Sequence, residues 1–161
     1  MSQKPHRVRT WAPCGKTPVL EFDFNWTKLS VIGGLTVLNF YFKFYPGTIK
    51  SPQVIELLKH LQQQLPGKLL LIWDGAMIHR SRLVRAYLES LQGRLYAAAL
   101  PAYAPELNPI EYAWGYFKQH RLPNFCARAL AHLSAFGRKA LRNMRRRPKL
   151  VAAFWKQAEL W

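Results

Sequence analysis

Residues 69–73 read LLLIW, an unbroken apolar run that lies between Gly67 and Gly75. A short apolar run bounded by glycines is typical of a strand covered on both faces, as strands of a parallel sheet are. Asp74 follows the run directly. Ligand sites in open α/β sheets lie beyond the carboxyl ends of the strands. The stretch therefore predicts an α/β fold and places an acid at the edge where such sites occur.

The flanking sequence alternates helical and strand patterns. Residues 51–65 carry leucines at helical spacing after Ser51, which we expect to be the N-cap. Residues 81–91 repeat this pattern after Ser81, and residues 95–100 predict a second buried strand. Because a crossover helix separates the two predicted strands, we expect them to pair in parallel.

The two ends of the chain complete the predicted elements. Residues 1–17 are polar and interrupted by prolines, which predicts an extended arm. Residues 29–45 are rich in β-forming side chains and predict a hairpin that turns at Asn39. A helix is expected from Pro109, and helical sequence continues from about Phe125.

The charge composition limits the kind of molecule that the protein is expected to bind. The chain has 161 residues, which fits one domain, and it carries 24 Lys and Arg against 8 Asp and Glu, a net charge of +16. Residues 121–161 hold ten basic residues and one acidic residue, a net of +9. We therefore divide the domain into residues 1–120 and a basic helical C-terminal extension, residues 121–161. This excess of positive charge indicates a polyanionic partner, either nucleic acid or an anionic membrane surface.

Several classes of protein are excluded by simple patterns. No apolar run reaches the roughly 18 residues of a membrane-spanning helix, and the first residues do not form a secretory signal. Cys14 and Cys126 stand far apart, which supports neither a disulfide framework nor a zinc site. We expect a reduced, cytoplasmic protein that associates with the nucleoid when bound to DNA.

Two of the eight acidic residues lie at positions suited to metal-dependent chemistry. Asp74 follows a strand, and Glu111 enters on the first turn of the helix that Pro109 begins. Carboxylate oxygens at one rim of a sheet suit Mg²⁺ or Mn²⁺, and two such ions support phosphodiester chemistry. On spacing alone, two other interpretations are commoner: an Asp that caps a turn, and a Glu that complements a helix dipole.

The sequence motifs around these two acids resemble those of a known family. WDGAMIHRS (73–81) and LPAYAPELNPIEYAWGYFK (100–118) resemble the second and third acidic motifs of DDE transposases. The match is to the mariner superfamily, in its bacterial insertion-sequence branch. RTWAPCGKTPVL (9–20) is similar to the segment that joins the family's first catalytic strand to the next hairpin. The resemblance extends from residue 9 to about residue 120.

The resemblance implies an RNase H-like mixed sheet flanked by helices, with metal-dependent cleavage and joining of DNA strands. It assigns Asp74 as the second catalytic acid and Glu111 as the third, both ligands of a two-ion Mg²⁺ or Mn²⁺ site. Glu106 is the alternative acid, ranked lower because Glu111 lies at the ordered helix start. His79 is expected to support the site, and Asn108 to cap the helix.

One part of the family pattern is missing. The first acid of the family lies on a strand just before the RTWAP-like segment, but only eight residues precede Arg9 and none is acidic. Glu21 and Asp23 follow that segment and do not match. We therefore expect the fold to lack its first catalytic strand, leaving unpaired strand edges. We also expect the chain to be inactive alone, as an N-terminally truncated catalytic domain.

The missing acid and strand are consistent with two origins of the chain. One is a split reading frame whose upstream half is encoded separately, and the other is a decayed remnant of a transposase. The main alternative function is a non-catalytic, basic DNA-binding remnant; a membrane-surface protein is disfavoured because the tail aromatics form no clear apolar face. The expected partner is DNA at transposon ends, with a homodimer implied by the resemblance. We expect phosphate contacts from Arg80, Arg82, Lys118, Arg145, Arg146 and Arg147.

Overall fold

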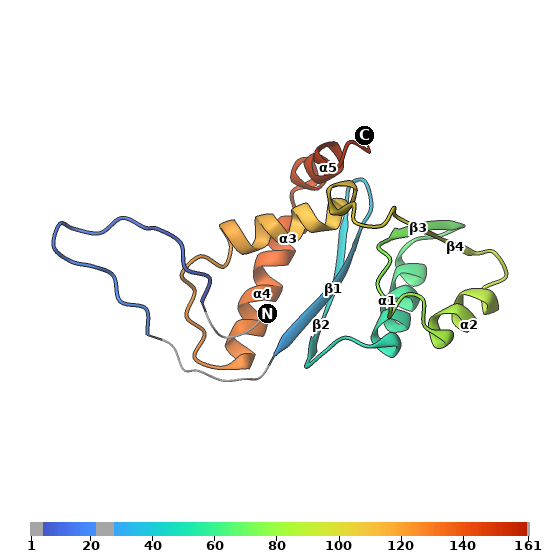
Figure 1. The fold of residues 1–161 in the computed structure, drawn as a ribbon, viewed down its shortest axis with the longest axis horizontal. Helices are drawn as coiled ribbons and strands as arrows, with labels where there is room; N and C mark the ends of the chain where they lie inside the picture. Colours follow the sequence, from blue (N-terminus) through green and yellow to red (C-terminus); the bar gives the residue numbers. More distant parts are fainter. Residues whose placement is uncertain (1–4, 22–27, 161) are drawn as a thin grey trace.

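The computed structural model of the protein describes residues 5–21 and 28–160. Over this part of the chain it contains four strands, five α-helices and one short 3₁₀ turn (Figure 1). Their order is β1 (Leu29–Leu35), β2 (Phe40–Pro46), α1 (Ser51–Gln64), β3 (Leu69–Trp73), α2 (Arg82–Ser90), β4 (Leu95–Ala99), η1 (Pro105–Leu107), α3 (Pro109–His120), α4 (Leu130–Arg145) and α5 (Pro148–Gln157).

The strands form two separate sheets. β1 and β2 make an antiparallel hairpin, and β3 pairs with β4 in parallel. These pairings confirm the predicted hairpin and the predicted strand–helix–strand unit. In the described part of the chain no strand lies between β1 and β3, so the expected mixed sheet is divided in two.

The hairpin is the central layer of the fold, with helices on both of its faces (Figure 1). Side chains alternate between the two faces of a strand. Phe40 and Phe44 point toward α3, α4 and α5, whereas Tyr41 points toward α1. The first face forms the hairpin core, whose buried residues are Leu29, Phe40, Phe44, Ala113, Phe117, Ala127, Leu133, Ala140, Leu141, Met144, Val151 and Phe154.

A second cluster, the β3 core, lies between the hairpin, α1, α2 and the β3–β4 sheet. Its buried residues are Tyr41, Val54, Leu57, Leu58, Leu61, Val84 and Leu95. The basic C-terminal helices take no part in it, because α4 and α5 pack on the opposite face of the hairpin.

The β3–β4 sheet is covered on one face only, so the prediction of two buried strands is wrong in part. Leu69 and Leu71 pack against the β3 core, whereas Leu70 is 69% exposed and Ile72 is 44% exposed. In β4 only Leu95 is buried. An unbroken apolar run specifies a strand but not the number of layers around it, and here no described helix covers the second face.

The helix starts follow local capping chemistry. Ser81 caps α2 as predicted, with its Oγ accepting a hydrogen bond from the backbone N of Val84 at 3.3 Å. Ser51 is instead the first residue of α1, and Lys50 is the N-cap. The Lys50 N–H donates to the Gln53 Oε1 at 2.9 Å, so the Gln53 side chain takes over the capping.

The helical sequence after residue 125 forms two helices rather than one. α4 ends at Arg145 and α5 begins at Pro148. The residue before a proline is disfavoured in the α conformation, and Arg147 adopts a non-helical backbone as the N-cap of α5. The buried side chains of α4 include Leu133, Leu141 and Met144, which belong to the hairpin core.

Long-range hydrogen bonds connect the N-terminal segment to the connection between α3 and α4. Residues 5–21 form no helix or strand, as predicted for an arm, but His6 bridges Pro123. The Asn124 amide then exchanges two bonds of 3.0 Å with the backbone of Val8. Among the described helices none is long and apolar enough to cross a membrane.

Candidate functional site

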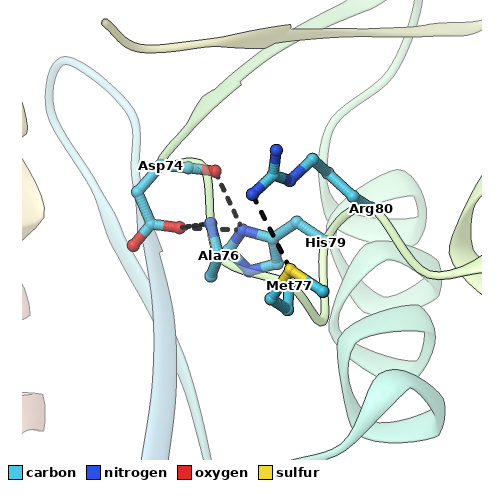
Figure 2. Close-up of polar contacts among 5 residues, drawn as sticks. All are labelled: Asp74, Ala76, Met77, His79 and Arg80. Carbon is cyan, nitrogen blue, oxygen red and sulfur yellow. Dashed lines mark hydrogen bonds and ion pairs between the residues drawn. The ribbon is translucent and has the colours of Figure 1, made fainter. Parts of the chain in front are cut away.

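Asp74 lies directly after β3, as the sequence predicts, at the start of a tight turn. Its Oδ1 accepts a hydrogen bond from the backbone N of Ala76 at 3.1 Å, which holds the carboxylate over the turn (Figure 2). The side chain is 53% exposed. The carboxylate is therefore fixed in direction yet remains accessible from solvent.

His79 lies in the turn that follows Asp74 and contacts the Asp74 side chain. Its Nδ1 lies 3.0 Å from the Asp74 Oδ1 and 3.3 Å from the Asp74 backbone O (Figure 2). The imidazole also stacks on Trp73, with ring centroids 4.4 Å apart and planes 5° from parallel. His79 is thus held by both a ring contact and a polar contact, and its side chain is only 15% exposed.

Two basic residues belong to the same segment. The Arg80 guanidinium lies 3.8 Å from the Met77 sulfur and is exposed (Figure 2). Arg82 is the first residue of α2 and is also exposed. The turn between β3 and α2 therefore presents one carboxylate and two guanidinium groups to solvent.

Glu111 lies in the first turn of α3, and its backbone N donates to the Asn108 O at 3.0 Å. Asn108 occupies the N-cap position but makes no side-chain cap bond, so its predicted capping role is wrong in that respect. It is the only buried polar or charged residue in the described part of the chain. Glu106, the alternative acid, is exposed in η1.

A single groove brings these positions together. It lies between β1 and β3 and has a volume of about 410 Å³. We call it the β1–β3 groove; its walls are residues 31–35 of β1 and residues 69–73 of β3, with α1 below and the start of α3 beside them. Its lining includes Asp74, His79, Asn108 and Glu111.

The acids of the groove are not gathered into a cluster of three ligands among the described residues. In the described ranges no group of three or more His, Cys, Asp or Glu side chains is placed to hold a metal ion. Asp74 and His79 contact each other, whereas Glu111 lines the same groove without joining them in such a group. Among the described residues, the groove therefore offers two separate carboxylates, Asp74 and Glu111, as candidate ligands of a divalent ion.

The other predicted basic residues are exposed on the C-terminal helices. Lys118 lies near the end of α3, about two turns beyond Glu111. Arg145 ends α4, Arg146 is its C-cap and Arg147 is the N-cap of α5. The predicted phosphate contacts are thus divided among the β3–α2 turn, α3 and the α4–α5 junction.

Sequence reasoning missed the aromatic residues that shape the site. Trp73 stacks on His79, and Trp114 and Trp155 line the β1–β3 groove. The aromatic residue directly before Asp74 was an available signal for the first contact. The groove itself had no local signal, because its walls are edges of strands that lie about 35 residues apart in the sequence.

Comparisons with known proteins place the chain in a family. Residues 1–131 match the family of DDE superfamily endonucleases. No curated protein matches the sequence. The chain therefore belongs to the DDE superfamily endonucleases.

The structure is similar to solved structures of the Mos1 transposase. The Mos1 strand transfer complex gives a TM-score of 0.64 at 19% identity, covering 96% of this chain and 46% of that chain. The Mos1 mariner paired-end complex with Mn gives 0.64 at 23% identity, covering 97% and 48%. The catalytic domain of Mos1 mariner transposase gives 0.54 at 20% identity, covering 80% and 73%.

These similarities confirm the predicted α/β, RNase H-like fold, which is that of the Mos1 catalytic domain. This chain spans about half the length of the Mos1 proteins in the two complexes.

Proposed function

We propose that the chain is the catalytic-domain part of a transposase from the bacterial insertion-sequence branch of the mariner superfamily. Its reaction is the metal-dependent cleavage and joining of DNA strands. One observation carries the proposal: Asp74 and Glu111, the acids of the two motifs, line one groove in a chain whose net charge is +16. The family match and the fold are consistent with this activity.

The metal-binding role is proposed for Asp74 and Glu111, with Mg²⁺ or Mn²⁺ as the ion. His79 keeps the Asp74 carboxylate in position through its Nδ1 contact at 3.0 Å. Because the described residues do not complete a metal site, we propose that the third acid comes from outside them. The chain alone is then inactive, as one half of a split transposase or as a remnant of one.

Metal binding tests this assignment. We expect weak Mn²⁺ binding, followed by electron paramagnetic resonance, that Asp74→Asn and Glu111→Gln each reduce and that Glu106→Gln leaves unchanged. Binding that ignores both Asp74→Asn and Glu111→Gln contradicts the metal site and favours the non-catalytic remnant. Mn²⁺-dependent nicking of plasmid by the chain alone, lost in Asp74→Ala, contradicts its inactivity.

DNA binding is proposed to depend on the exposed basic residues. Removing a basic side chain that neutralises a phosphate reduces the salt dependence of binding, because fewer counterions are released. Replacing Arg145, Arg146 and Arg147 by alanine is expected to weaken binding and to lower the slope of log K against log salt by roughly 1 for each phosphate that the variant no longer neutralises. Fluorescence anisotropy with a labelled duplex measures both quantities, and an unchanged slope excludes these residues from the interface.

Assembly at transposon ends is proposed by analogy with the Mos1 paired-end complex. We propose that two copies of the chain hold two DNA ends together. Sedimentation of the chain with and without a labelled duplex tests the dimer, and one chain per duplex at all concentrations contradicts it.

A further inference from the structure

Asn108 has a polar side chain that the fold leaves without a partner. The residue is 8% exposed, and its side-chain amide makes no hydrogen bond in the described part of the chain. Its main-chain groups are both used: the N–H donates to the Pro105 O at 3.0 Å, and the O accepts from the Glu111 N at 3.0 Å. Buried side-chain amides in folded proteins mostly have a partner, so we expect the partner of this one to be a bound ligand.

The sequence offers Asn108 a local partner that the structure does not use. Residues 108–111, NPIE, match a capping box, in which the N-cap and the third helical residue each bond to the main-chain N–H of the other. Here the Asn108 side chain makes no cap bond, and its N–H is taken by Pro105. The Glu111 carboxylate likewise has no hydrogen bond or ion pair in the described ranges. Both side chains therefore remain free to bind a ligand.

Both side chains face the same space. Asn108 and Glu111 line the β1–β3 groove, as Asp74 does. The N-cap and the third helical residue are close enough for reciprocal bonds in a capping box, so their side chains lie within reach of one small ligand. The start of α3 thus presents an amide oxygen and a carboxylate to a single ligand in the groove.

The charges of the groove favour a cation as this ligand. Among its described lining residues there is no Lys or Arg, whereas Asp74 and Glu111 contribute two full negative charges. The N-terminal end of α3 adds about half a positive charge, which offsets only part of them. Because Asn108 is almost fully buried, it is accessible to an ion or a water molecule rather than to a sugar–phosphate backbone. Carboxylate, carbonyl and water oxygens are the ligands that suit Mg²⁺ and Mn²⁺.

We propose that the Asn108 Oδ1 is a ligand of the divalent ion that Glu111 binds. The amide and the Glu111 carboxylate supply two oxygen ligands to Mg²⁺ or Mn²⁺, and water or a DNA phosphate supplies others. Since the amide is neutral, it adds an oxygen ligand without adding negative charge that repels the phosphate. The inference rests on the proposed function and adds to its metal site a residue that is not an acid.

The backbone holds Asn108 in place without help from an ion. Pro105 and Pro109 restrict the main chain on either side of it, and the two main-chain hydrogen bonds of 3.0 Å fix its position between η1 and α3. A ligand on such a rigid segment is preorganised for binding. Asn108 therefore differs from an exposed asparagine, whose side chain loses conformational freedom when it binds an ion.

Mn²⁺ binding to the full chain, followed by electron paramagnetic resonance, tests the ligand. Even residues that only support metal ligands change metal affinity by about 10–100-fold, so Asn108→Ala is expected to lower it by about tenfold or more. Asn108→Asp keeps an oxygen and adds a negative charge, and is expected to bind Mn²⁺ at least as tightly as the unaltered chain. Asn143→Ala removes an exposed amide from α4 and is the control without effect.

A sulfur ligand tests for direct contact with the ion. Asn108→Cys replaces the oxygen by a thiol, which selects soft ions over hard ones. With Cd²⁺ this variant is expected to show a sulfur-to-cadmium charge-transfer absorbance above the background of the unaltered chain, which keeps Cys14 and Cys126. Adding Glu111→Gln is expected to weaken the absorbance. A role of Asn108 in folding alone does not produce this signal, so its absence overturns the inference.

The outcomes separate this inference from the proposed function. Mn²⁺ affinity that falls in Glu111→Gln but not in Asn108→Ala overturns the Asn108 ligand and leaves the two acids as the metal site. Mn²⁺ affinity that none of Asp74→Asn, Asn108→Ala and Glu111→Gln changes overturns both. Urea denaturation shows whether each variant is folded. If Asn108→Ala is unfolded, Asn108→Asp decides, and weaker Mn²⁺ binding than in the unaltered chain overturns the inference.

Discussion

The hairpin and the β3–β4 sheet differ in how they are covered. Both have strongly apolar sequences, yet the hairpin is packed on both faces, with Phe40 fully buried, whereas the outer face of β3 leaves Leu70 69% exposed. The difference lies in the covering layers: α3, α4 and α5 pack on one face of the hairpin and α1 on the other, but α1 and α2 alone cover β3 and β4 (Figure 1). Apolar character thus specifies a strand, while neighbouring elements decide its burial.

The largest expected effect comes from truncating a side chain in the hairpin core. Phe40→Ala removes a fully buried ring and is expected to lower the free energy of unfolding by about 3–5 kcal/mol. Leu70→Ala is the matched change on the open sheet, and it is expected to cost less than about 1 kcal/mol. Urea denaturation followed by circular dichroism measures both, and similar losses contradict the difference in coverage.

Two adjacent glycines of β1 test the two faces of the same strand. A Cβ at Gly33 lies 2.9 Å from the Phe40 ring and 3.0 Å from the Tyr41 O, whereas at Gly34 the nearest atom is the Leu61 Cδ1 at 3.7 Å. Gly33→Ala is expected to destabilise the fold by about 1–3 kcal/mol through overpacking. Gly34→Ala is expected to be neutral, or stabilising by up to about 1 kcal/mol, since it restricts the unfolded chain.

The same urea assay compares these two variants. A loss of stability in Gly34→Ala that equals the loss in Gly33→Ala contradicts the asymmetry of packing across β1.

The contact between His79 and Asp74 tests the β3 wall of the groove. His79→Phe keeps a ring against Trp73 but removes the Nδ1 that lies 3.0 Å from the Asp74 Oδ1. Removing such a supporting interaction typically reduces metal affinity by about tenfold or more, and we expect this reduction in Mn²⁺ binding. Full Mn²⁺ affinity in His79→Phe excludes a positioning role. His60→Phe is the control, because the His60 imidazole packs against the Tyr41 ring and not against an acid.

The smallest effect is expected at the link between the hairpin and α1. The Lys43 Nζ lies 2.6 Å from the Glu56 Oε1, and the Tyr45 hydroxyl donates to the Glu56 Oε2 at 2.7 Å. These bonds lower the pKa of Glu56, with the Lys43 bond as the main cause, and burial together with the Glu56 bond raises the pKa of Tyr45. Because Glu56 is exposed, Glu56→Gln is expected to cost less than about 1 kcal/mol.

The direction in which stability depends on pH follows from the lowered pKa of Glu56. A carboxyl whose pKa is lowered by folding stabilises the fold fully above its unfolded pKa, and this stabilisation is lost as the pH falls through the folded pKa. The difference in urea midpoint between Glu56→Gln and the unaltered chain is therefore expected at about pH 7 and should disappear at about pH 2. A difference that grows on acidification contradicts the ion pair as its source.

Local patterns predicted the elements that depend on nearby residues. LLLIW predicted β3, Ser81 predicted the cap of α2, and the fragments around Asp74 and Glu111 indicated the family. The break between α4 and α5 also has a local cause, since Pro148 disfavours a helical conformation at Arg147. The exposed face of β3 was not predictable locally, because it depends on which elements surround the strand.

The positions of the two candidate acids in the fold were predictable to the same extent. The positions of Asp74 and Glu111 followed from strand-end and helix-start patterns, and the structure places both along the β1–β3 groove. Asn108 was predicted as a cap because asparagine favours that position, yet it is buried without a side-chain cap bond. Such a difference is set by packing around α3, which the local sequence does not encode.

The bond from the Trp155 Nε1 to the Thr36 O, 2.9 Å long, has a consequence for how the protein is made. It joins residues 119 positions apart, and Phe154 beside it completes the hairpin core. At a synthesis rate of about 5–20 residues per second, the ribosome needs roughly 6–24 s to reach Trp155 after Thr36. Throughout this interval the phenylalanine face of the newly made hairpin lacks the part of its cover that α5 supplies, so apolar surface stays open to non-native contacts until α5 is made.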